Sequence, residues 1–190
     1  MFRSRHLRFL MSVGLAVVLV IVLLIVIFSH VGGPPSPTPK PMAAYANNPS
    51  AQVAMLIDGP VNAVSEHNQV LIAITNSQTT VNVFKGYSNQ VLKSESFTMD
   101  EPAFHVFLRS LEYASFNSGS NNPKLSQASG YCPTGNRYIF TFKVNGKQVQ
   151  RYWATSCGGT HTFDGNLSLT ITLFQAQVPH YGSYVSGLNI

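Results

Sequence analysis

The chain has 190 residues, with 12 Lys and Arg against 7 Asp and Glu, and a formal net charge of +5. The positive charge is unevenly placed, because residues 45–190 carry eight Lys and Arg against seven Asp and Glu, a net charge of +1. A basic nucleic-acid-binding domain is therefore excluded as the source of the charge, and we expect no nucleic-acid partner. The length leaves room for one domain of about 130 residues after the N-terminal region.

The N-terminus combines a basic tail, residues 1–8, with an apolar run from Phe9 to Phe28 that contains 20 uncharged residues. A helix of this length, at about 1.5 Å per residue, crosses a hydrocarbon core of ~30 Å. The arginines precede the run and the next charge downstream is Lys40, so the positive-inside rule predicts a cytoplasmic N-terminus and an extracytoplasmic C-terminal domain. We expect a single-pass signal anchor in the cell membrane, with the lipid bilayer as a partner of Phe9 to Phe28.

A cleaved signal peptide is the alternative to this anchor. Its apolar region would be unusually long, and the only good small-x-small site, Ala44-Tyr45-Ala46, lies far beyond the apolar run. The segment from Gly32 to Pro41 carries five of the eleven prolines and predicts a polyproline-type spacer, although a ligand for an SH3-like module has the same composition. We place a flexible stalk at residues 29–52, a folded domain at 53–181 and a loosely packed tail at 182–190.

The strongest local signal is a β-hairpin, because Asn145-Gly146 separates two alternating runs, 137–144 and 147–154. A two-residue turn there predicts that Phe140 faces Arg151 and Tyr138 faces Trp153, which puts Arg151 on the apolar face. The same register places Thr134 opposite Cys157, so a disulfide between Cys132 and Cys157 at the open end of the hairpin is geometrically plausible. In an oxidising compartment it would stabilise the domain by roughly 3 to 4 kcal/mol.

Further elements follow from hydrophobic periodicity. Residues 69–75, 80–85 and 90–97 predict a meander of three strands, and Met55 to Ile57 predicts an edge strand or a docked loop. Thr98 to Glu101 has the form of a capping box that opens a helix through Leu111. Residues 167–178 fit either a strand or a helix, and we choose a helix because its pattern continues to Pro179. The expected fold class is α+β, a transmembrane helix plus a small domain of order β-β-β-α-β-β-α with an antiparallel sheet and two helices.

Few residues suggest chemistry. Ala154 to Cys157 invites comparison with the nucleophile motif of sortases, but no Lys or Arg follows Cys157, and a disulfide would remove the thiolate. The histidines have no metal-ligand spacing, and no phosphate loop is present, so we expect no metal and no cofactor. Arg151, His161 and Asp164 are the candidate binding residues. The loops 117–131 and 158–165, which flank the two cysteines, are the candidate contact surfaces.

The C-terminal half resembles a group of uncharacterised, short, membrane-anchored extracytoplasmic proteins from candidate-phyla bacteria of the Saccharibacteria type. The resemblance covers about residues 70–181, and an aspartate is common in the group where this chain has His180. It implies an extracytoplasmic domain with paired cysteines, implies nothing about activity, and favours a helix at 167–178. The residues that carry it are Cys132-Pro133-Thr134-Gly135, Arg137-Tyr138, Trp153, Thr155-Ser156-Cys157, Thr162-Phe163, Gly165-Asn166, Leu173-Phe174-Gln175, Gln177-Val178-Pro179 and Tyr181.

These features favour a membrane-tethered extracytoplasmic binding module, stabilised by one disulfide, that contacts a protein or an envelope polymer. One alternative is a cell-envelope hydrolase or transferase whose site combines Arg151, His161 and Asp164, which requires these side chains to converge in one pocket. Another is a protease-inhibitor-like domain that presents a loop held by the disulfide. The sequence favours a protein without catalysis, because no catalytic constellation is recognisable.

Overall fold

The computed structural model describes residues 40–88 and 90–190, and its folded unit runs from Pro41 to Ile190. The predicted cytoplasmic tail, the transmembrane segment and most of the predicted stalk lie outside the described residues. Within the described ranges, no helix has both the length and the apolar character that a bilayer span requires.

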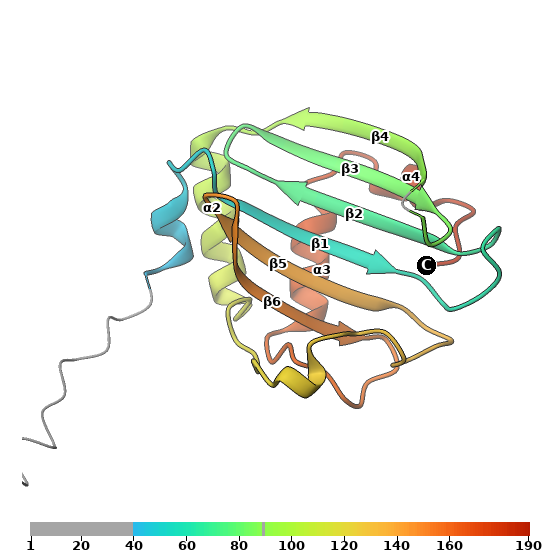
Figure 1. Cartoon of the computed structure of the whole chain (residues 1–190). Helices are drawn as coiled ribbons and strands as arrows, with labels where there is room; N and C mark the ends of the chain where they lie inside the picture. The colour runs from blue at the N-terminus through green and yellow to red at the C-terminus, as the bar shows by residue number, and fades with distance from the viewer. Residues whose placement is uncertain (1–39, 89) are drawn as a thin grey trace, which may run out of the picture. The chain divides into compact units, whose positions relative to one another are not determined.

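The folded unit is built on one antiparallel sheet of six strands in the order β4-β3-β2-β1-β5-β6 (Figure 1). A three-stranded meander, β2-β3-β4, lies on one side of β1, and the β5-β6 hairpin lies on the other. The strands are β1 (Gln52–Asp58), β2 (Asn68–Ile74), β3 (Gln78–Lys85), β4 (Gln90–Thr98), β5 (Arg137–Val144) and β6 (Lys147–Thr155).

Helices cover one face of the sheet, where α2 and α3 lie side by side behind the strands in Figure 1. The α+β class and the antiparallel sheet are thereby confirmed, with six strands in place of the five expected. The helical elements are α2 (Glu101–Tyr113), α3 (Leu167–Gln175), the short α4 (Tyr181–Val185) and two 3-10 turns, η1 (Met42–Tyr45) and η2 (Pro123–Leu125).

The sixth strand comes from β1, which the sequence suggested only as an edge strand or docked loop. In the structure β1 lies at the centre of the sheet, paired with β2 on one side and β5 on the other. Val53, Met55 and Ile57 point into the main core and are at most 3% exposed. The expectation of an edge position was wrong because β1 is far from its second partner, β5, in sequence, and no local pattern encodes that pairing.

The main core lies between the sheet and the helices. The aromatic rings of Phe116, Phe140 and Phe174 meet at centroid distances of 5.8 to 6.4 Å. A second, smaller cluster lies on the other face of the sheet, where Ile139 and Trp153 pack against Ala128. The sheet is therefore covered on both faces at its β5-β6 end, and this end positions the candidate site.

The register of β5 and β6 differs from the predicted one by one residue. Val144 pairs with Lys147 as expected, but a β-bulge lets Phe142 pair with Gln150, and Phe140 then pairs with Tyr152. Because side chains alternate between faces, this shift moves Arg151 and Trp153 from the predicted core face to the opposite face. The turn was predicted correctly, whereas the bulge has no signature in the sequence.

Both predicted helices are present, with one difference at a terminus. α2 begins with Asp100 as its N-cap, whose carboxylate accepts a hydrogen bond of 2.8 Å from the Ala103 amide, so the predicted Thr98-to-Glu101 capping box does not form. Asp is as good an N-cap as Thr, and Pro102 then falls in the first turn, where a missing N–H costs nothing. At the second helix, the choice between strand and helix is settled by α3, which Asn166 caps.

Two segments expected to be loose are packed. Met42 in η1 is 3% exposed and its amide donates to the Glu112 carboxylate of α2, so the residues from Pro41 onward belong to the fold and not to the stalk. At the other end, Tyr184 in α4 is 9% exposed and its hydroxyl donates a 2.6 Å hydrogen bond to Glu95 of β4. Several apolar and aromatic side chains account for both corrections. Ala46 and Ala51 are buried as Met42 is, and Val185, Leu188 and Ile190 pack against the same core as Tyr184.

Candidate functional site

The loop 117–131 is attached to the face of β6 opposite the helices by two side chains of that strand. The Arg151 guanidinium donates to the Ser126 carbonyl at 2.6 Å, and the Trp153 indole N–H donates to the Leu125 carbonyl at 2.7 Å. Arg151 and Trp153 are two residues apart and therefore point to the same face of the sheet. The bulge in β6 is thus what places both donors under the loop.

Apolar packing adds to this attachment. The Tyr131 ring lies 4.9 Å from the Trp153 ring, measured between centroids, and Trp153 has no exposed surface. Leu125 packs against the same cluster. The side of the loop that faces β6 is therefore hydrophobic, although its composition of Ser, Asn, Gly and Gln suggested only a long polar segment.

The loop 117–131 is linked at its start to the segment 158–165 and, just after its end, to the residue that precedes this segment. At its start, Gly119 forms a β-bridge with Phe163, and the Ser120 amide donates to the Thr162 carbonyl at 2.8 Å. At its end, Cys132 is bonded to Cys157, with 5.7 Å between the two Cα atoms, as the hairpin predicted. Both loops that flank the cysteines are therefore linked to each other and to the open end of the β5-β6 hairpin.

Between this loop and β6 lies a polar pocket of about 330 Å³, here called the Arg151 pocket. Its lining contains four side-chain amides, several hydroxyls and one cation, and neither Asp nor Glu. The lining residues are Ser120, Asn121, Asn122, Pro123, Leu125, Ser126, Gln127, Gln148, Arg151 and Thr162. Such a surface is suited to hydrogen bonding with a polar molecule and offers little to an apolar one.

Arg151 is half-buried in this pocket, and desolvation of its guanidinium lowers the pKa of Arg151. Its hydrogen bond to Ser126 uses one of five N–H donors. Among the residues that the structure describes, no carboxylate lies within ion-pair distance of Arg151. The charge that the sheet brings to the pocket is therefore not neutralised by a described protein group.

The other two predicted site residues are elsewhere. His161 and Asp164 lie 3.7 Å apart, from Nε2 to Oδ1, and both side chains are about half exposed to solvent. His161 lines a separate, smaller cavity of about 200 Å³, which shares no lining residue with the Arg151 pocket. The structure thus brings His161 and Asp164 together and leaves Arg151 in a different site, so the single convergent pocket that a hydrolase of this design requires is not formed.

One polar cluster was missed by sequence reasoning. Asp58, at the end of β1, lies 2.8 Å from Arg137 Nε and 3.1 Å from His67 Nε2, and it accepts a 2.8 Å hydrogen bond from Gln69. His67 has no exposed surface, its Nδ1 donates to the Pro60 carbonyl at 2.9 Å, and its ring stacks on Tyr87.

This Asp58 cluster fixes the loop that joins β1 and β2 to the end of the sheet. Arg137, which is 3% exposed, also donates to the Gly59 carbonyl at 2.5 Å. His67 and Arg137 are at most 3% exposed and the Asp58 side chain is 20% exposed, and the polar groups of the cluster bond to one another and to the loop, so its role is structural. A usable signal was present in the sequence, because an acid directly after an apolar strand and an arginine at the start of another can meet at one sheet end.

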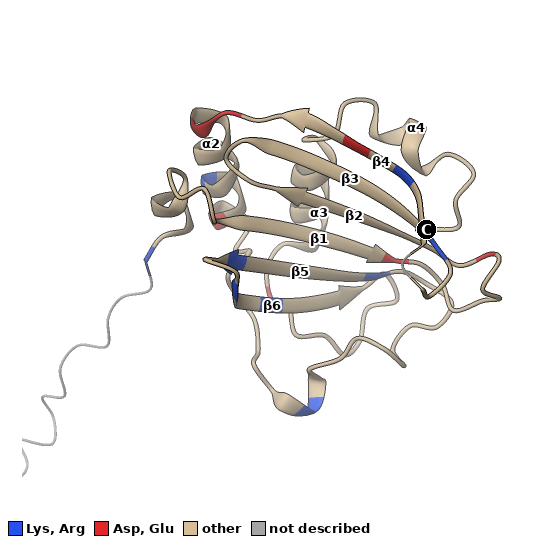
Figure 2. Cartoon of the chain, turned by 45° about the horizontal axis from the view of Figure 1, so that its top comes forward, with Lys and Arg blue, Asp and Glu red and all other residues tan. Residues whose placement is uncertain are grey.

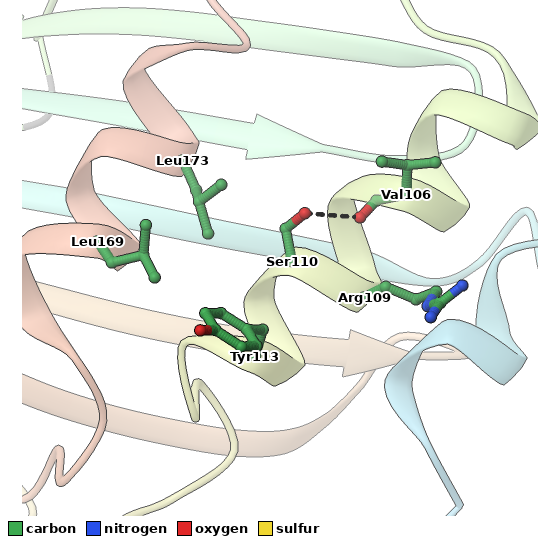
Figure 3. Close-up of a pocket in the computed structure, with 6 residues that line it drawn as sticks. All are labelled: Val106, Arg109, Ser110, Tyr113, Leu169 and Leu173. Atoms are coloured by element: carbon green, nitrogen blue, oxygen red, sulfur yellow. Dashed lines mark hydrogen bonds between the residues drawn. The ribbon is translucent and has the colours of Figure 1, made fainter.

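A third feature is an apolar groove between α2 and α3, on the helical side of the molecule (Figure 3). Its volume is about 430 Å³, and Leu169 and Leu173 of α3 face Tyr113 and Ser110 of α2 across it. Tyr113 is 86% exposed. The groove lacks the concentration of hydrogen-bonding groups that distinguishes the Arg151 pocket.

Charge and metal-ligand patterns add no further site. Figure 2 shows the Lys, Arg, Asp and Glu positions as short, separated stretches of the ribbon, with both signs present. Over residues 40–88 and 90–190, no three His, Cys, Asp or Glu side chains are arranged to hold a metal ion.

Comparison with known proteins adds no family assignment. No protein-family model matches the chain, and a search of curated proteins finds no similar sequence.

Proposed function

We propose that the chain is a membrane-tethered extracytoplasmic binding module that holds a polar envelope component in the Arg151 pocket. The observation that carries this proposal is the pocket itself, whose lining combines one cation with four amides beside a strand. Binding sites commonly place a few polar groups on loops that a rigid scaffold positions. Here the scaffold is the β5-β6 hairpin and its disulfide.

The remaining parts of the chain support a role at the cell surface. The apolar run from Phe9 to Phe28 provides the anchor, and the proline-rich segment after it provides a spacer of about 3.1 Å per residue. A disulfide persists in oxidising compartments, which agrees with a domain outside the cytoplasm. The resemblance to short membrane-anchored proteins of Saccharibacteria-type bacteria supports the same placement.

A pair of bulky substitutions on adjacent residues of β6 tests the pocket. Gln148 lines it, whereas Val149, the next residue, is 59% exposed and is absent from its lining. We expect the full chain in lipid nanodiscs to bind at least one member of a panel of soluble neutral and acidic oligosaccharides, measured by isothermal titration calorimetry. Gln148→Trp should weaken that binding at least tenfold, and Val149→Trp should leave it within about twofold.

The outcome decides the proposal in either direction. Binding that both variants retain equally would move the site elsewhere and contradict the assignment. Absence of binding across the panel would contradict the proposed function, because these oligosaccharides carry the polar groups that the pocket is proposed to hold. Circular dichroism of both variants provides the control, because an intact fold is needed before a loss of binding can be assigned to the pocket.

A further inference from the structure

The Arg151 pocket contains a positive charge that lacks a described counterion. The guanidinium is half-buried and keeps one hydrogen bond, to the Ser126 carbonyl, while no acid lines the pocket. A buried charge without a partner is costly, and a ligand that supplies the opposite charge recovers that cost. The downward shift in the pKa of Arg151, caused by desolvation, agrees with this view of an underneutralised site.

The number of cations indicates which anion fits. Arg151 is the only Lys or Arg in the lining, since Lys124 of the neighbouring η2 is exposed and does not take part in it. One guanidinium matches the single charge of a carboxylate and its two oxygens, which a planar fork of N–H groups can bind together. A phosphate monoester carries more charge than one cation neutralises.

The rest of the lining indicates what surrounds the carboxylate. The side-chain amides of Asn121, Gln127 and Gln148 have no protein hydrogen-bond partner within the described residues. Each amide can donate and accept at once, which suits hydroxyl and acetamido groups. Pro123 and Leu125 are the only apolar side chains in the lining, so the pocket offers no seat for a large apolar side chain of a peptide.

We infer that the Arg151 pocket binds a sugar acid, with the carboxylate paired to Arg151 and neighbouring hydroxyl or acetamido groups bonded to the amides. This inference rests on the proposed binding function and specifies its ligand class. The volume of about 330 Å³ is at the lower end of the range of about 300–1,000 Å³ that holds small ligands, so one or two sugar units fit. Two sources of this chemistry are a uronic-acid polymer and a lactyl-bearing amino sugar.

Esterification of the ligand tests the inference without altering the protein. Calorimetry on the full chain in nanodiscs would compare tetragalacturonate, N-acetylmuramic acid, the methyl esters of both and neutral chitotetraose. We expect one of the two acids to bind, its methyl ester to bind at least tenfold more weakly, and the better acid to identify the source. Equal affinity for acid and ester would overturn the inference.

Substitutions of Arg151 supply the protein side of the test. Arg151→Gln should weaken binding of the acid at least tenfold and binding of its ester by less than about threefold, because only the ester lacks the charge that Arg151 pairs with. Arg151→Lys should reduce affinity for the acid less than Arg151→Gln does. Lys85→Gln, which removes an exposed charge at the end of β3, is the control for a general electrostatic effect and should change affinity less than twofold. Loss of affinity for acid and ester alike in Arg151→Gln would show that the residue acts only by holding the loop, which also contradicts the inference.

Different results would contradict the binding function of the pocket and the assignment of a sugar acid as its ligand. If neutral and esterified sugars bind as well as the acids, and Gln148→Trp still abolishes their binding, the pocket functions as proposed and the carboxylate assignment is wrong. If a peptide with a free C-terminal carboxylate binds in an Arg151-dependent way while the sugar acids do not, the ligand class is wrong. If no probe binds in a way that depends on Gln148, both the inference and the proposed function fail.

Discussion

At the scale of single residues, buried charged contacts should contribute more to the stability of this domain than exposed ones. Asp58 neutralises Arg137 and contacts His67, neither of which is more than 3% exposed. His161 and Asp164 form the contrasting pair, since their 3.7 Å contact is open to solvent on both sides. The Asp58 contacts are buried and include an arginine, whereas the Asp164 contact is solvent-exposed and involves only a histidine, so removal of the two carboxylates should differ in its effect on stability.

We expect Asp58→Ala to lower the free energy of unfolding by about 3 to 5 kcal/mol, because it leaves a buried arginine without its counterion. Asp164→Ala is the control at an exposed carboxylate and should cost less than about 1 kcal/mol, since contacts between solvent-exposed polar or charged groups contribute little. Urea denaturation monitored by Trp153 fluorescence measures both values. A cost for Asp58→Ala as small as that of the control would show that the cluster is not a stabilising element.

At the scale of elements, the least predictable feature is the bulge in β6. Asn145-Gly146 correctly predicted the turn, and the alternation of apolar residues correctly predicted the strands. The extra residue at Val149 then shifted the pairing of the remaining strand, and with it Arg151 and Trp153. Their hydrogen bonds to the loop 117–131 depend on that shift. The sequence therefore predicts Arg151 as a candidate binding residue, but it does not predict the Arg151 pocket.

The disulfide was predictable because it needs only the hairpin ends to be near each other, and a shift of one residue leaves them near. We expect the paired substitution of Cys132 and Cys157 by Ser to lower the free energy of unfolding by about 3 to 4 kcal/mol, the value for a closed loop of this length. Hydrogen exchange of loop 117–131 should rise at the same time, more than exchange in β2. Unchanged protection of the loop would show that Arg151 and Trp153 hold it unaided.

α4 provides a pH-dependent contact at the opposite end of the sheet. The Tyr184 hydroxyl of this helix donates a hydrogen bond to Glu95, and this bond, together with burial, raises the pKa of Tyr184 above the ordinary value of 10.0. A raised pKa means that folding favours the neutral ring, so its contribution is complete below pH 10 and is lost as the pH rises through the folded-state pKa.

We therefore expect the urea midpoint to be insensitive to Tyr184 ionisation at pH 8 and to fall above about pH 10. In Tyr184→Phe this alkaline loss should be smaller, because the hydroxyl that ionises next to Glu95 is absent. Tyr113→Phe, a change at an exposed ring of α2, is the control and should retain the alkaline loss of the unmodified chain. Identical pH profiles for all three proteins would exclude Tyr184 as the responsible group.

At the scale of the whole molecule, local patterns predicted the class of fold but not the arrangement of its strands. The meander and the hairpin are local, and both were recognised. The central position of β1 is non-local, because β1 precedes β5 by some 80 residues and joins the meander and the hairpin into one sheet. The packing of Met42 and Tyr184 is likewise non-local, which explains why both ends of the folded unit were placed too far inward.

The division between anchor and folded unit yields the last prediction. Because the folded unit begins at Pro41, a protease site introduced at residues 35–37 should allow cleavage that releases the domain from membranes. Its free energy of unfolding should stay within about 0.5 kcal/mol of the uncut value, since surface changes away from packed features have effects of this size.

Cleavage after Ala46 is the matched control, because it removes Met42 and η1 from α2, and loss of a buried methionine should cost about 2 to 5 kcal/mol. If the domain is released before any protease is added, the Phe9 to Phe28 segment acts as a cleaved signal and not as an anchor. If both cuts destabilise equally, residues before Pro41 contribute to the fold and the boundary is wrong.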